Sequence, residues 1–189
     1  MPEGLGQSKP PPNKRKREMT KTLEKKTINE QEELDRAERE GKKYVLYKKV
    51  GNLWQIRACR DILVTASKGD LGGFIQTEEN LSQEGMSWVS QNAKVWGNAR
   101  VSDDAKVWGN ARVYGNAKVS GIATVSENGE VCGNATISDA GEVRGDTNVS
   151  GDAKVGGNAK VCGNARICGN AEIGGNAIVK SKVLEGKIN

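Results

Sequence analysis

Residues 93–119 read AKVWGNARVSDDAKVWGNARVYGNAKV and contain the pattern that decides the fold. Within this stretch an aliphatic residue recurs at every sixth position, from Val95 to Val119. The same spacing extends outward in both directions, from Val89 to Val179, with Val or Ile at all sixteen positions. A period this strict indicates one structural unit stacked on copies of itself.

Each six-residue unit contains a short strand followed by a corner. In Ala-x-Val the small and the branched residue share one face, because strand side chains alternate. Gly-Asn follows, as at Gly97-Asn98, because a sharp corner needs positive φ, which these two residues tolerate. Three such units close a three-sided coil, and neighbouring coils stack about 4.8 Å apart. The pattern predicts an all-β parallel helix of about five coils, and the six-residue spacing excludes an amphipathic α-helix.

The rest of the chain divides by composition. A Pro-rich, basic start indicates flexibility, and the Glu, Lys, Gln and Arg that follow favour a helix. Alternating apolar residues around Gly51-Asn52 predict a hairpin, which would cap the open end of a solenoid. The predicted segments are a disordered basic arm (1–18), a helical arm (19–41), an N-terminal β cap (42–86), the β-helix solenoid (87–180) and a C-terminal cap or tail (181–189). Whether the helical arm is solvated or docks on a partner or another copy is left open.

Four motifs carry a family resemblance: LWQIRACRD (53–61), KGDLGGFI (68–75), EENLSQEG (78–85) and WVSQNAKVWGNARV (88–101). They resemble the YdcK-like β-solenoid family, which occurs in bacteria, phages and prophages. The resemblance implies a single-stranded left-handed parallel β-helix of the hexapeptide type. It alone implies the left hand, since the general crossover rule favours the right.

The residue types present argue against an enzyme. The hexapeptide-type solenoids that the chain resembles include acyltransferases. These enzymes generally use His as a general base, but the chain contains no His. The four cysteines form no CxxC motif, so neither a zinc site nor a disulfide framework is expected, and no cofactor is predicted. The Gly-rich stretch 69–73 lacks the Gly-Lys-Ser/Thr ending of a phosphate loop, and we interpret it as a tight turn. Free thiols favour a reducing, cytoplasmic location, with a virion as the alternative, and no membrane segment is expected.

Basic and aromatic side chains gather in the first coils and at the start of the chain. Such a mixture is typical of surfaces that bind nucleic acid or another anionic polymer, whereas a plain solvated face is the alternative. The candidate binding surface comprises Lys94, Arg100, Lys106, Arg112 and Lys118, with Trp96, Trp108 and Tyr114. The candidate arm contacts are Lys14, Arg15, Lys16 and Arg17.

The sequence therefore favours a non-enzymatic β-helical binding or structural module, encoded by a phage or prophage. It would act through a protein partner, as a virion component or as an inhibitor of a host defence or nucleic-acid-processing complex. Two alternatives are nucleic-acid or anionic-polymer binding through the basic coils, and a hexapeptide-type acyltransferase, which the missing His disfavours. Homo-oligomerisation is left open.

Overall fold

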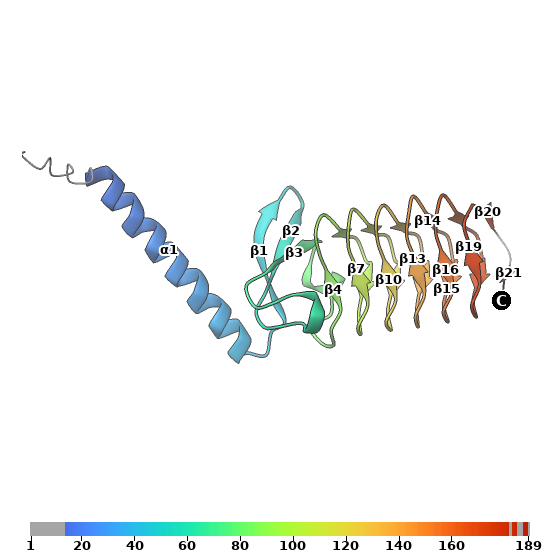
Figure 1. Ribbon diagram of the computed structural model, residues 1–189, viewed down its shortest axis with the longest axis horizontal. Coiled ribbons are helices and arrows are strands. Elements are labelled where there is room, and N and C mark those ends of the chain that lie inside the picture. Colours follow the sequence, from blue (N-terminus) through green and yellow to red (C-terminus); the bar gives the residue numbers. More distant parts are fainter. Residues whose placement is uncertain (1–13, 182, 185–186, 189) are drawn as a thin grey trace, which may run out of the picture.

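A computed structural model describes residues 14–181, 183–184 and 187–188. It contains an N-terminal helix, an antiparallel hairpin and a long parallel β-solenoid, arranged one after another along the longest axis (Figure 1). The helix projects from the end of the rod that carries the hairpin. The parallel solenoid predicted from the hexads is confirmed.

The elements before the repeats are α1 (Lys14–Arg39), β1 (Tyr44–Val50), β2 (Leu53–Ala58), β3 (Leu71–Ile75) and two 3-10 helices, η1 (Leu63–Thr65) and η2 (Glu78–Asn80). Two-residue strands then follow, one per hexad from β4 to β19, and β20 and β21 lie beyond the last hexad. They are β4 (Trp88–Val89), β5 (Lys94–Val95), β6 (Arg100–Val101), β7 (Lys106–Val107), β8 (Arg112–Val113), β9 (Lys118–Val119), β10 (Thr124–Val125), β11 (Glu130–Val131), β12 (Thr136–Ile137), β13 (Glu142–Val143), β14 (Asn148–Val149), β15 (Lys154–Val155), β16 (Lys160–Val161), β17 (Arg166–Ile167), β18 (Glu172–Ile173), β19 (Ile178–Val179), β20 (Val183–Leu184) and β21 (Lys187–Ile188).

The strands form three parallel faces along the rod. Face 1 has the order β3-β5-β8-β11-β14-β17-β20 and is continued by the hairpin strands, face 2 has β6-β9-β12-β15-β18-β21, and face 3 has β4-β7-β10-β13-β16-β19. Each hexad strand pairs with the strand one coil further on, as Val95 does with Val113 and Val113 with Val131. This register confirms the predicted three-sided coil.

The inward Val, Ile and Ala side chains form one continuous core. Val107 and Val143 have no exposed surface, as the alternation predicts. Their outward neighbours Lys106 and Glu142, which the alternation predicts to be exposed, are only partly so. Side chains on adjacent coils stand about 4.8 Å apart and cover one another's stems, which accounts for the difference.

The first turn of the rod lies inside the segment predicted as a separate cap. Ile75 of β3 pairs in parallel with Val95, and Leu81 forms a parallel bridge with Val101. Ile75 and Leu81 are fully buried, like the hexad valines. Extra residues between Leu81 and Val89 interrupt the six-residue period, so the sequence pattern misses this turn. The rod consequently has about six turns rather than five.

The hairpin closes the first turn. β1 and β2 pair antiparallel around the predicted turn at Gly51-Asn52. The predicted turn in the Gly-rich stretch is present at Gly69, which has φ +92°, but Gly72 and Gly73 lie within β3. A Cβ on Gly73 would meet the Ala93 carbonyl oxygen at 2.6 Å. Strand alternation beside the inward Val89 would place Trp88 on the outside of the rod, but Trp88 is buried and meets Tyr44 edge-on with ring centroids 6.4 Å apart. The hairpin covers it, which the hexad alternation alone does not show.

Helix α1 begins earlier than predicted, at Lys14, so the basic run Lys14 to Arg17 is helical rather than part of a disordered arm. The side chains of Lys14 and Arg15, and the predicted arm before residue 14, lie outside the described part of the chain. The helix ends at Arg39, and Gly41 follows with φ +77°, a conformation that glycine adopts readily and that commonly ends helices.

Candidate binding surfaces at the cap end of the rod

The structure distributes the five predicted surface cations over all three faces. Lys94 and Arg112 are neighbours on face 1, Arg100 and Lys118 are neighbours on face 2, and Lys106 lies on face 3. The two pairs occupy the same two coils, on either side of one edge of the rod. Lys106 is therefore separated from the other four.

The face 1 pair lies in a hollow with a mixed polar and apolar lining. The hollow has a volume of about 530 Å³ and is lined by Val50, Leu53, Phe74, Asn92, Lys94, Asn110, Arg112 and Asn128. Its apolar wall comes from the hairpin and β3. The three asparagines form a ladder in which the amide of Asn92 donates to Asn110 at 3.3 Å and that of Asn110 to Asn128 at 3.2 Å. None of the lining residues is acidic, so the hollow suits an anionic group beside an apolar one.

The face 2 pair lies in a different electrostatic environment. Arg100 and Lys118 share their hollow with Glu78 and Glu79 of η2. A hydrogen bond from the Thr77 hydroxyl lowers the pKa of Glu79, and the nearby charge of Arg100 contributes less. The carboxylates offset the positive charge in this hollow. On face 1 the nearest carboxylate in the column, Glu130, accepts a hydrogen bond from Tyr114 and does not line the hollow, so the face 1 pair is the stronger candidate for binding an anion.

The three predicted aromatic residues do not form one platform. Trp96 and Tyr114 stack nearly parallel, with centroids 4.6 Å apart, on the edge between faces 1 and 2. Each ring covers a face of the other, and the Tyr114 hydroxyl donates to the Glu130 carboxylate, which raises the pKa of Tyr114. Trp108 lies at a different corner of the coil, apart from the other two rings, and is exposed. The pair stabilises adjacent coils and leaves less ring surface for a stacked base than the sequence implies.

Cations at the two ends of the rod differ in their partners. Toward the C-terminal end, Lys154 pairs with Glu172 at 3.3 Å and Lys160 with Glu142 at 3.2 Å. Within the described ranges, none of the five cations near the cap takes part in an ion pair. Among the described residues Arg166, further along the rod, takes part in no ion pair either, so ion pairing separates the five cations near the cap from Lys154 and Lys160.

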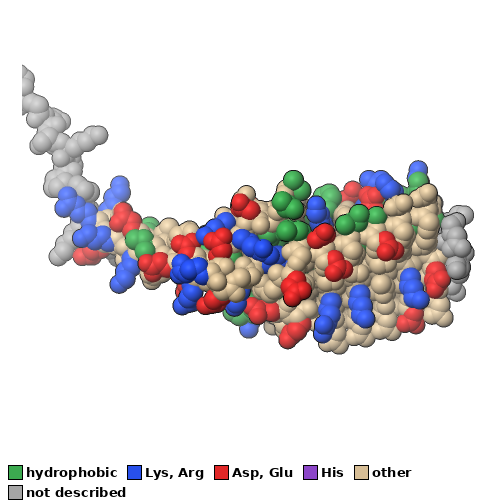
Figure 2. Space-filling model, turned by 90° about the horizontal axis from the view of Figure 1, so that it is seen from below, with side chains coloured by type: hydrophobic (Ala, Val, Ile, Leu, Met, Phe, Trp, Pro, Cys, Tyr) green, Lys and Arg blue, Asp and Glu red, His purple; other side chains and the backbone are tan. Residues whose placement is uncertain are grey.

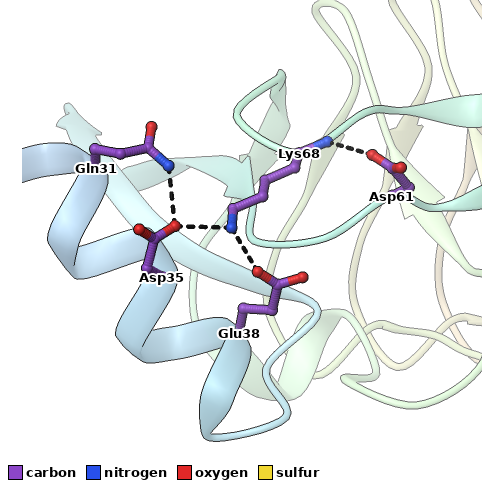
Figure 3. Close-up of polar contacts among 5 residues, drawn as sticks. All are labelled: Gln31, Asp35, Glu38, Asp61 and Lys68. Carbon is purple, nitrogen blue, oxygen red and sulfur yellow. Dashed lines mark hydrogen bonds and ion pairs between the residues drawn. The ribbon is translucent and has the colours of Figure 1, made fainter.

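The last part of α1 is docked on the cap. Leu34 and Ala37 are buried against Cys59 and Val45. Lys68 bridges the helix to the cap through Asp35 at 2.8 Å and Glu38 at 2.5 Å, while its backbone N–H donates to Asp61 (Figure 3). Glu30 pairs with Arg57 at 3.2 Å. These contacts fix the direction in which the helix leaves the rod.

A buried lysine, which the sequence analysis did not single out, joins the helix exit to the first coil. The Lys43 ammonium donates to the Glu84 carbonyl at 3.1 Å and to the Ser87 hydroxyl at 3.0 Å. Burial lowers the pKa of Lys43 to about 8, and nearby Arg60 contributes to the shift. No sequence signal distinguishes Lys43 from the exposed lysines around it, because its burial depends on the loop that interrupts the hexads.

We expect docking of α1 to weaken in acid. The bond from Lys68 lowers the pKa of Asp35, so its stabilising contribution is present above the ordinary pKa of 3.8 and is lost as the pH falls through the lowered value. Asp35 and Glu38 raise the pKa of Lys68 above its ordinary value of 10.5. The stabilising contribution of Lys68 is therefore fully present below pH 10.5 and is lost only as the pH rises through the raised pKa. NMR signals of Ala37, followed from about pH 7 to about pH 2, should report release. In Lys68→Met the change in the Ala37 signals between about pH 7 and about pH 2 should be smaller than in the wild type. Wild-type signals that stay unchanged in acid would contradict this account.

Two further observations limit the chemistry. No group of three or more His, Cys, Asp or Glu side chains in the described part of the chain is placed to hold a metal ion. Among the same residues, the search for a helix with the length and hydrophobicity of a membrane span finds none.

The comparisons with known proteins give no family. No protein-family model matches the chain, and the curated proteins include no match to it. The parallel solenoid of about six turns is consistent with a hexapeptide-type β-helix, and membership of the YdcK-like family stays a prediction.

Proposed function

We propose that this chain is a non-enzymatic β-helical binding or structural module that acts through a protein partner. Phage or prophage origin, and a role as a virion component or as an inhibitor of a host defence or nucleic-acid-processing complex, form part of this proposal and derive from the family resemblance. The observation that carries it is the asymmetry of the rod. Five outward cations without an ion pair and a docked, projecting helix lie at the cap end, whereas Lys154 and Lys160 further along have acidic partners.

The shape of the surface supports binding over catalysis. The hexads run without an inserted loop that could wall an active site, and no His is available as a general base. The hollows at the cap end are open to solvent and lie against the outer surface of the rod. An acetyl-CoA binding assay distinguishes the acyltransferase alternative, because a ligand of the native state must raise the melting temperature.

A capture experiment tests the proposed function. Immobilised full-length protein should retain a specific protein from lysate of the bacterial host, and Lys94→Gln with Arg112→Gln should reduce retention at least about tenfold if the face 1 hollow lies within the interface. Lys154→Gln with Lys160→Gln removes the same charge from the far end and should leave retention unchanged. Equal losses from both double variants, or no specific protein with the wild type, would contradict the proposal.

Nucleic-acid or anionic-polymer binding is the second candidate, and the face 1 hollow favours it. Lys94 and Arg112 lie one coil apart in a hollow lined by exposed amides and by no acidic residue, which suits contacts with successive phosphates. Glu130 follows Arg112 in the same column, and its carboxylate accepts a hydrogen bond from Tyr114. Nuclease treatment of the lysate separates the candidates. Retention that survives nuclease supports a protein contact, and retention that disappears supports nucleic acid.

A further inference from the structure

The part of α1 before its docked end is surrounded by solvent. Residues 16–29 are all exposed, including Met19, Leu23 and Ile28, each with more than half of its surface accessible. At about 1.5 Å per residue this half of the helix extends about 20 Å beyond its contacts with the cap. An isolated helix of this length is marginal in water, so a binding partner would stabilise it.

The two halves of α1 carry opposite charge. Residues 16–29 contain five Lys or Arg and two Glu, whereas residues 30–39 contain five acidic residues and two Arg. In Figure 2, Lys and Arg side chains gather toward the helix end that lies away from the rod. The first turn of the helix contains no acidic residue, so positive charge meets the positive end of the helix dipole. An anionic partner would relieve this repulsion.

The cations lie on opposite sides of the projecting half. With 3.6 residues per turn, Lys16 and Lys26 flank Met19 on the side that continues the docked stripe, whereas Lys21 and Lys25 lie on the other side. A protein groove receives one side of a helix, and here neither side is free of cations. Met19 and Leu23 share the side that continues the docked stripe, whereas Ile28 lies opposite Met19. Two glutamates, Glu18 and Glu24, lie on the side of Lys21 and Lys25, and the five cations of the segment outnumber them. The arrangement suits a partner with negative charge along both flanks of the helix.

Pairing with α1 of a second copy does not fit this pattern. A parallel pair would place basic halves together. An antiparallel pair would need Leu34 and Ala37 for its apolar seam, and the cap already buries both residues. The major groove of B-form DNA fits better: it is about 12 Å wide, close to the helix diameter of about 10–12 Å, and phosphates line both of its sides.

We propose that residues 16–29 of α1 bind duplex DNA by lying in the major groove, with Lys16 and Lys26 facing the phosphates of one strand and Lys21 and Lys25 those of the other. Such contacts position the protein without reading sequence. The inference goes beyond the protein partner of the proposed function and differs from its second candidate, which places nucleic acid in the face 1 hollow. Its test uses DNA alone, so failure of the DNA-binding inference does not contradict the proposed protein partner, and failure of the capture experiment does not contradict DNA binding.

The experiment is a salt titration of binding between full-length protein and a mixed-sequence duplex of about 20 base pairs, measured by fluorescence anisotropy. Lys16→Gln with Lys26→Gln, and separately Lys21→Gln with Lys25→Gln, should each reduce the slope of log affinity against log salt by about two. Gln preserves helix propensity, which circular dichroism verifies. Lys154→Gln with Lys160→Gln is the charge-matched control and should not change the slope.

Four outcomes would overturn the inference. These are absence of binding at about 50 mM salt, an effect of only one helix pair, equal affinity for single and double strands, and loss of binding caused by Lys94→Gln with Arg112→Gln alone. An effect of only one helix pair would indicate that DNA contacts one side of the helix. Loss of binding in the Lys94→Gln, Arg112→Gln variant alone would place the DNA-binding site on the rod. Binding to polyglutamate but not to DNA would identify an acidic protein surface instead.

Discussion

Replacing Val131 by aspartate is expected to prevent folding of the rod. Val131 has no exposed surface and lies between Val113 and Val149 of the neighbouring coils. A carboxylate in this column would have no partner, since the core around it consists of aliphatic side chains. An uncompensated buried charge costs about 3–5 kcal/mol, and the lost valine packing adds to it. The whole free energy of unfolding of a native domain is only about 5–15 kcal/mol.

Circular dichroism and urea unfolding provide the measurement. The variant should be insoluble or lack a cooperative transition. Thr136→Asp, at an outward position in the next hexad, serves as the control and should unfold close to the wild type. A soluble Val131→Asp protein with the wild-type midpoint would contradict the three-sided core.

The second large effect is expected at Gly73, where the cap meets the first full coil. Alanine there would place its Cβ 2.6 Å from the Ala93 carbonyl oxygen and 2.8 Å from a Val89 methyl group. Because the first of these atoms belongs to the backbone, a strand must shift to make room. Such overpacking costs about 1–3 kcal/mol. We expect a correspondingly lower urea midpoint, with the slope of the transition unchanged.

Gly129→Ala is the matched control. Gly129 occupies the position that Ala holds in most hexads, and its added Cβ would lie 3.0 Å from the nearest atom, the Ser126 carbonyl oxygen. The coils accommodate alanine at equivalent positions such as Ala93 and Ala111, which are fully buried. Its effect should therefore stay within about 1 kcal/mol. Equal destabilisation by both substitutions would show that the cap seam is no tighter than an ordinary coil.

The sequence pattern was sufficient for the parts of the fold that repeat. Val and Ala at fixed spacing determine which side chains point inward, and Gly51-Asn52 determines the hairpin, because both signals are local. Contacts between distant segments were not accessible in this way. Leu81 belongs to the first turn although the six-residue spacing breaks beside it, and Trp88 is buried because the hairpin folds over it.

The candidate site was predictable to the same extent. The eighteen-residue coil correctly places Lys94 beside Arg112. It does not show that Glu78 and Glu79 lie against Arg100, because they come from a turn outside the repeats. The docking of α1 depends on Lys68, a residue from the loop region between β2 and β3 with no distinguishing pattern of its own. The ion pairs of Lys154 with Glu172 and of Lys160 with Glu142, by contrast, join residues eighteen apart on adjacent coils and follow from the repeat.

Hydrogen exchange of the free protein, resolved by segment, tests most directly whether α1 offers a free binding element. The account predicts strong protection from β3 onward through the rod, intermediate protection over residues 30–39, and rapid exchange over residues 16–29, because only the middle segment contacts the cap. Protection over residues 16–29 equal to that over residues 30–39 would contradict the account, since the projecting half would then already be covered.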